Sequence, residues 1–373
     1  MRHASLPGAT CACIIPPEIY CDIDVKWMTL FAERSLHGLK CLPALLLVVI
    51  AAGCGGEFPQ STLHPTADFG YEVDDLFRII FWWAVVVFVV VEVGLLYIIL
   101  RFRERSGSPE PRRIHGSTLL EVAWTLAPAL VLVFIAVPTI RTIIDVSGRA
   151  PDDALVIDVI GHQWWWEYRY LDFDITTANE VHVPQGRTVQ FRMTSVDVIH
   201  SFWVPKIGGK RDVLPGRTTY IAFTPDSIGT FFGQCAEFCG VSHANMGLRL
   251  MVDSPSEFAD WIRQEQNPPP PTEALDTEAQ RGFEAFTAVR DPGNHSCLAC
   301  HVVEGVTFGV LGPNLTHVGS RTTIAGGVLP MTADGLAEWL RDPLRVKPGS
   351  LMPDIDLTEE EISALVAYLS TLR

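Results

Sequence analysis

Two cysteines, a histidine and a methionine lie close together in one short segment, as Cys235, Cys239, His243 and Met246. Thiolate, thioether and imidazole groups favour copper, whereas Mg²⁺ and Ca²⁺ prefer oxygen ligands. The first three residues recur at every fourth position, so one helical turn or a tight loop would direct them to one side. His200, in an alternating and therefore strand-like stretch upstream, is the best candidate for a further ligand. These donors exceed the needs of one trigonal copper ion, and bridging sulfurs would hold a pair of ions.

Spacing alone leaves two other interpretations of the cysteines open. They could form a disulfide, or they could join the two histidines in a structural zinc site. The segment 234–246 as a whole, however, resembles the CuA motif of cytochrome c oxidase subunit II almost residue for residue. The resemblance implies that Glu237 contributes its backbone carbonyl to the centre and directs its side chain toward a magnesium site shared with the partner subunit. It also implies a set of side-chain ligands for the binuclear copper: His200, Cys235, Cys239, His243 and Met246.

A second cofactor is indicated by Cys297-Leu298-Ala299-Cys300-His301, the attachment sequence of c-type haem. In this pattern Cys297 and Cys300 bind the haem covalently, and His301 is an axial ligand of the iron. Met352 is the predicted second axial ligand, and a His/Met pair suits electron transfer. The order of these motifs resembles a class I cytochrome c. Three other residues are predicted to be structural or exposed rather than ligands: Met331, His317 and His295.

Two long apolar runs, Ile79–Leu100 and Leu119–Ile140, are each near the ~20 residues that a membrane-spanning helix needs. Together they predict a transmembrane hairpin. The connecting segment is rich in arginine, and the positive-inside rule therefore places it in the cytoplasm. Everything after Arg141 is then expected on the outer side. The formal charge of −15 argues against nucleic acid as a partner.

Carboxylates inside spans are candidates for function. We expect no such role for Glu92, which can pair with a neighbouring helix. Glu121 lies in a segment that resembles the start of the second helix in the oxidase family, and the resemblance implies a position at the mouth of a proton channel of the catalytic subunit. By the same resemblance, Trp164 is the residue through which electrons enter CuA. Lys210 and Asp212 match a family segment that faces the catalytic subunit.

Short alternating runs separated by Pro and Gly turns occupy residues 154 to about 258, which predicts a Greek-key sandwich of the cupredoxin type. The proline run 268–271 marks a linker. The fold class is thus a multi-domain membrane protein: a two-helix transmembrane hairpin, an all-β cupredoxin domain and an all-α cytochrome c domain. The predicted layout is a presequence and signal peptide (1–54), an external segment (55–78), transmembrane helices (79–100 and 119–140) joined by a cytoplasmic loop (101–118), the CuA domain (141–263), the linker (264–276) and the cytochrome c domain (277–373).

The N-terminal region has the pattern of a secretory signal from Met28 onward, and Met28 competes with Met1 as the true start. The segment ending at Cys54 resembles a lipoprotein cleavage box, which would make Cys54 a lipidated N-terminus. An ordinary signal, uncleaved or cleaved elsewhere, is the alternative.

The combined motifs resemble subunit II of a respiratory oxidase that carries its own cytochrome c, in a bacterial inner membrane with both cofactor domains outside. The resemblance implies subunit I and subunit III as partners. The external donor would be a basic cytochrome c or a quinol-cytochrome c reductase, because acidic residues outnumber basic ones in the haem domain. An electron-transfer subunit of another reductase, such as a nitric oxide reductase, is the alternative. A copper-assembly protein would not need a fused haem, and quinol oxidase subunits lack these copper ligands.

Overall fold

The computed structural model describes residues 58–103, 107, 116–147, 150–289 and 296–373. The predicted signal peptide, Met28, Cys54 and His295 lie outside the described residues. So does most of the arginine-rich loop. Within residues 59–373 the chain forms a helical hairpin, a β-sandwich and a C-terminal helical domain.

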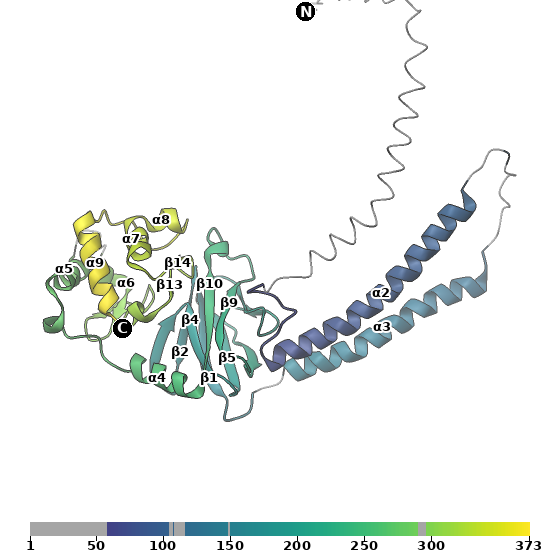
Figure 1. Ribbon diagram of the computed structural model, residues 1–373, viewed down its shortest axis with the longest axis horizontal. Helices are drawn as coiled ribbons and strands as arrows, with labels where there is room; N and C mark the ends of the chain where they lie inside the picture. The colour runs from purple at the N-terminus through teal and green to yellow at the C-terminus, as the bar shows by residue number, and fades with distance from the viewer. Residues whose placement is uncertain (1–57, 104–106, 108–115, 148–149, 290–295) are drawn as a thin grey trace, which may run out of the picture. The chain divides into compact units, whose positions relative to one another are not determined.

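The hairpin consists of α2 (Asp68–Phe102) and α3 (Thr118–Val146), which run alongside each other (Figure 1). Trp83 stacks on Phe134 between them, with ring centroids 5.6 Å apart. Both helices are long and apolar enough to cross a membrane, and their apolar side chains are largely exposed. Helix α2 begins well before the predicted apolar run, at Asp68, whose carboxylate accepts hydrogen bonds from the amides of Phe69 and Thr224.

Two five-stranded sheets make up the β-sandwich domain, defined here as residues 155–253. The first sheet has the order β3 (Ile175–Ala178), β2 (Trp165–Tyr170), β1 (Leu155–His162), β5 (Val189–Ser195) and β8 (Thr219–Phe223). The second has the order β4 (Glu180–Pro184), β10 (Gly247–Asp253), β9 (Gly229–Cys235), β6 (His200–Trp203) and β7 (Arg211–Val213).

Alternation of buried and partly exposed residues along β5 and β10 explains how the sheets pack. Residues two apart share a face, so Phe191 and Met193 of β5 and Leu248 and Leu250 of β10 are buried in one core cluster. The parallel pairs β1–β5 and β4–β10 interrupt the antiparallel pattern, as expected where strands cross between sheets. The predicted cupredoxin-like sandwich is confirmed.

The C-terminal domain, residues 277–373, has its own core. Its helices are α5 (Thr277–Thr287), α6 (Cys297–Cys300), α7 (Ala333–Arg341), α8 (Pro343–Val346) and α9 (Glu359–Thr371). Two short hairpins, β11–β12 (Val302–Val303, Thr307–Phe308) and β13–β14 (Thr323–Ile324, Leu329–Pro330), complete it. Helix α4 (Pro255–Glu265) precedes the linker.

Helices α5 and α9 form the centre of this domain. Gly282 of α5 allows their close approach, since a Cβ at this position would overlap the Ala364 carbonyl group. Phe283 and Phe286 pack on Tyr368 of α9. Helix α9 begins with a capping box, in which the Thr358 hydroxyl and the Glu361 carboxylate each accept from the other's amide.

Candidate copper and haem centres

The predicted copper ligands converge at one end of the sandwich. The Cys235 sulfur lies 3.9 Å from Nδ1 of His200 and 3.8 Å from the Cys239 sulfur. The Cys239 sulfur lies 3.7 Å from Nδ1 of His243 and 3.9 Å from Sδ of Met246. The carbonyl oxygen of Glu237 lies 3.3 Å from the Cys235 sulfur, while the Glu237 side chain is exposed. All six predicted donors therefore surround one small volume.

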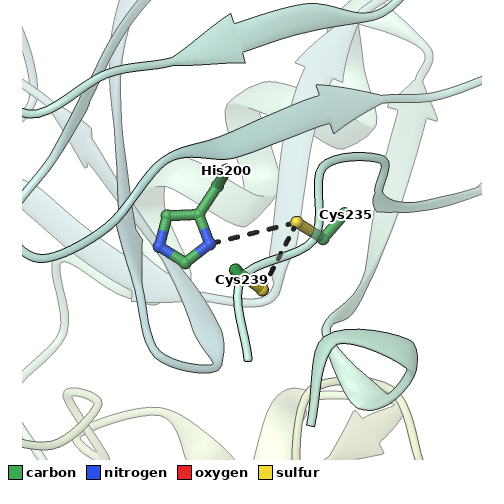
Figure 2. A group of neighbouring side chains, drawn as sticks. All are labelled: His200, Cys235 and Cys239. Carbon is green, nitrogen blue, oxygen red and sulfur yellow. Dashed lines mark hydrogen bonds between the residues drawn. The ribbon is translucent and has the colours of Figure 1, made fainter. Parts of the chain in front are cut away.

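Neighbouring strands bring the distant His200 to this loop. Strand β6, which starts at His200, pairs with the end of β9, so that Phe202 faces Cys235. Cys235 ends β9, and the remaining predicted ligands lie in the turn between β9 and β10, which contains a short 3-10 helix, η1 (His243–Asn245). Figure 2 shows the imidazole of His200 directed at the Cys235 sulfur, which in turn lies beside the Cys239 sulfur. The predicted tight loop, rather than a helical turn, positions the cysteines.

The distances and the donor types bear on the interpretations of the cysteines. A disulfide has an S–S bond of ~2.05 Å, so sulfurs 3.8 Å apart are not bonded to each other. A structural zinc site takes four tetrahedral ligands, which leaves Met246 and the Glu237 carbonyl without a role. The donor set instead fits two copper ions bridged by the two sulfurs, because thioether and thiolate sulfur suit copper.

Hydrogen bonding within the cluster shifts the proton affinities of its members. The hydrogen bond from Cys239 holds the pKa of the Cys235 thiol well below its usual range, and the resulting thiolate raises the pKa of Cys239. Burial opposes a charge on His200, but hydrogen bonds to Cys235 and Asp197 outweigh it and raise the pKa of the imidazole. The pocket therefore stabilises one negative sulfur and attracts a cation, which would displace the remaining protons.

Asp197 is a residue that the motif did not identify. Its carboxylate lies 2.8 Å from Nε2 of His200, on the side of the ring opposite Cys235. Metal-binding histidines commonly donate their second ring N–H to a carboxylate, which fixes the tautomer and the ring orientation. The same carboxylate accepts from the amides of Gln163 and Val198. In the sequence, only its position three residues before His200 could have indicated this role.

Trp164 lies directly beside the copper ligands. Its indole Nε1 donates to the carbonyl oxygen of Cys239 over 3.0 Å, and the side chain is buried. Gln163 donates to the same oxygen. A continuous contact therefore joins the Trp164 ring to the backbone of a copper ligand.

The haem-attachment residues form a compact group in the C-terminal domain. Cys297 and Cys300 begin and end α6, and His301 follows at its C-cap. Nδ1 of His301 bonds the Pro313 carbonyl at 2.8 Å, which leaves Nε2 for a metal. Burial lowers the pKa of His301 and favours the neutral, ligating form.

The surroundings of His301 fit a large apolar group. A Cβ on Gly312 would lie 2.7 Å from the imidazole, so the chain is drawn close around the ring. Met352 is partly buried against the domain core. Large apolar side chains nearby in sequence are otherwise strongly exposed: Phe308, Val310, Leu311 and Leu351. A bound haem would cover apolar surface that water now contacts. Met331 packs against the core, and His317 is buried, in line with the structural roles predicted for them.

Three other candidates are not among the predicted ligands of these centres. Glu121 is exposed in the first turn of α3, where the helix dipole favours a carboxylate. Lys210 and Asp212 line a shallow depression on the β-sandwich domain together with Arg217. Lys210 also lies 3.4 Å from the Ala236 carbonyl and so borders the copper loop.

Comparison with known proteins matches each part of the chain separately. The model of the cytochrome c oxidase subunit II transmembrane domain matches residues 63–142, that of the subunit II periplasmic domain matches 174–253, and that of cytochrome c matches 279–373. Cytochrome c oxidase subunit 2 of Alkalihalophilus pseudofirmus is 36% identical over 343 residues, covering 90% of this chain and 97% of the relative. The Bacillus subtilis protein of that name is 34% identical over 359 residues, covering 90% and 98%. The crystal structure of the subunit II periplasmic domain from Bradyrhizobium japonicum is 33% identical, with a TM-score of 0.31, and covers 32% of this chain and 97% of that one.

Proposed function

The chain belongs to the cytochrome c oxidase subunit II family, and from that premise we propose that it is the electron-input subunit of a respiratory oxidase. Electrons enter at haem c of the C-terminal domain, pass to CuA and continue to the catalytic subunit, which reduces oxygen to water and translocates protons. The observation that carries the proposal is the convergence of six copper donors in a chain that also contains a Cys-x-x-Cys-His sequence.

In this proposal Cys235 and Cys239 would hold the copper, together with His200, His243, Met246 and the Glu237 carbonyl. The centre supplies reversible one-electron chemistry when copper is bound. Asp197 orients His200, and burial of both sulfurs keeps bulk water from the ligands. Trp164 forms the electron entry through its contact with Cys239. The exposed Glu237 carboxylate is available for a magnesium ion shared with the catalytic subunit.

Haem c is held covalently by Cys297 and Cys300, with His301 and Met352 as axial ligands. The bond from His301 to the Pro313 carbonyl orients the imidazole. Such His/Met ligation gives a comparatively high potential. Exposed apolar residues around the attachment site support a haem that is largely enclosed by protein.

We place the chain in a bacterial inner membrane, with both cofactor domains on the outer side. Arg101 and Arg103 at the end of α2 support a cytoplasmic loop. Subunit I, and with it subunit III, would pack on α2 and α3, whose exposed apolar faces also contact lipid. Glu121, at the cytoplasmic end of α3, is proposed to lie at the mouth of a proton channel in subunit I. A lipid on Cys54 would add a further anchor.

The experiment is to purify the tagged chain from native membranes in mild detergent and to record its metal content, its reduced-minus-oxidised spectrum and its oxygen uptake. Copper and haem c should co-purify with the chain, and the preparation should take up oxygen. Met246→Leu should lose the CuA signal, whereas Met251→Leu, half-buried on β10, should retain it. Consumption of nitric oxide without oxygen uptake would assign the chain to a different reductase and would remove the proton-channel role of Glu121.

A further inference from the structure

A carboxylate of the β-sandwich domain is enclosed by hydrogen-bond donors of the C-terminal domain. Glu180 of β4 is only 3% exposed. Its oxygens accept from the amides of Thr322 and Thr323 at 2.7–3.1 Å and from both threonine hydroxyls at 2.6 and 2.7 Å. Burying a carboxylate costs free energy unless it is hydrogen-bonded in this way. Separating the domains would break all of these hydrogen bonds, which only water could then replace.

A buried lysine makes a second connection between the domains. Lys347 is 4% exposed, and its ammonium group donates to the carbonyl oxygens of Trp164 and Ala325. Trp164 belongs to the β-sandwich domain and Ala325 to the C-terminal domain, so one side chain bridges them. Nearby, the amide of Gly247 donates to the Gly326 carbonyl over 2.9 Å.

The segment after Lys347 lies on the Trp164 ring itself. A Cβ on Gly349 would lie 3.1 Å from Cη2 of that ring, and the φ of +83° at Gly349 favours glycine. Trp164 therefore has the Cys239 carbonyl on one side and the chain that leads to Met352 on the other. Its buried ring leaves no face open to a second protein.

We propose that Glu180 and Lys347 hold the C-terminal domain on the β-sandwich domain and thereby close Trp164 to external electron donors. Both are positioning residues, since they act through the placement of the segment 347–352. The inference rests on the proposed function and specifies the site at which an external protein can deliver electrons, which is the haem and not Trp164. An external donor reduces the haem, and each electron that the haem then loses is gained by CuA.

The first test is hydrogen–deuterium exchange of the purified complex. Thr322, Thr323 and Gly247, whose amides donate across the contact, should be strongly protected in the wild type. Glu180→Gln should increase their exchange about tenfold to a hundredfold, because hydrogen bonds to a charged acceptor are the stronger ones. Glu338→Gln, an exposed carboxylate paired with Arg345, is the matched control and should change nothing there.

A second pair of variants separates the contact from the fold. Gly349→Val places a branched side chain against Trp164, whereas Gly305→Val introduces the same side chain at a similar φ, +72°, where no atom lies within 4 Å of the new Cβ. Reduced soluble basic cytochrome c is then mixed with the oxidised complex. In the wild type and in Gly305→Val, haem c should be reduced before CuA. In Gly349→Val, CuA should also be reduced directly.

The outcomes distinguish this inference from the proposed function. Rapid exchange of the three amides in the wild type, or reduction of wild-type CuA as early as haem c, would overturn the closed contact while leaving the oxidase role intact. Absence of copper or haem from the purified complex would instead refute the proposed function. If Glu180→Gln fails to assemble, the proposal is still tested by amide exchange in the wild type and by the comparison of Gly349→Val with Gly305→Val.

Discussion

Replacing Asp197 by asparagine should weaken copper binding about tenfold to a hundredfold, the usual cost of losing a partner that orients a metal-binding histidine. The introduced amide has one oxygen, which can still accept from Val198, whereas the hydrogen bond that Gln163 donates to the second carboxylate oxygen is lost. The substitution also removes the charge that faces Nε2 of His200 at 2.8 Å. A tenfold change corresponds to about 1.4 kcal/mol, and charge-assisted hydrogen bonds exceed neutral ones by roughly that amount.

The assay is copper retention by the purified complex against increasing chelator, followed by the near-infrared band and electron paramagnetic resonance of CuA. Asp158→Asn is the control, because Asp158 forms a two-pronged ion pair with Arg192 on β1 and β5 instead of contacting a ligand. Equal copper retention in Asp197→Asn and the wild type would refute the orienting role. A similar loss in Asp158→Asn would show that the effect is general destabilisation.

Met352→Leu should convert the haem to a high-spin form with a lower potential, whereas Met331→Leu should leave the absorption spectrum unchanged, since only Met352 is predicted to bind the iron. Burial lowers the pKa of Lys347 from 10.5 to about 7. Between these two pH values the unfolded chain therefore binds more protons than the folded protein. The unfolding free energy of the wild type should rise with pH in this window by up to about 1.4 kcal/mol per pH unit relative to Lys347→Met. Unfolding is followed by haem absorption, and a difference in unfolding free energy between the wild type and Lys347→Met that stays constant with pH would contradict this. Gly282→Ala should destabilise the C-terminal domain by about 1–3 kcal/mol or more, because the new Cβ overlaps the Ala364 carbonyl, and unchanged thermal unfolding would exclude the close helix contact.

Local patterns in the sequence predicted much of the fold. Alternating runs predicted the β-sandwich because strands such as β5 and β10 bury every second residue. The Thr358/Glu361 pair located the start of α9 through its capping chemistry. The sequence could group the predicted copper ligands because four of them lie within twelve residues, Cys235 to Met246, and only His200 had to come from a distant strand.

The contact between the domains could not be predicted in this way. Glu180 and Thr322 are far apart in the sequence, and nothing local to either indicates that the carboxylate is buried rather than solvated. Lys347 has the appearance of an ordinary surface lysine, and its burial depends on carbonyl groups from two domains. Asp197 was visible as a neighbour of His200, but its role needed the orientation of the imidazole ring.

The most direct test of the central claim is an anaerobic reductive titration of the purified complex, with CuA and haem c of this chain monitored separately. We predict that haem c and CuA accept one electron each, that the CuA signal requires Cys235 and Cys239, and that oxygen reoxidises both through the catalytic subunit. A chain that contains zinc instead of copper at these cysteines, or whose haem exchanges no electrons with the metal centre, would contradict it.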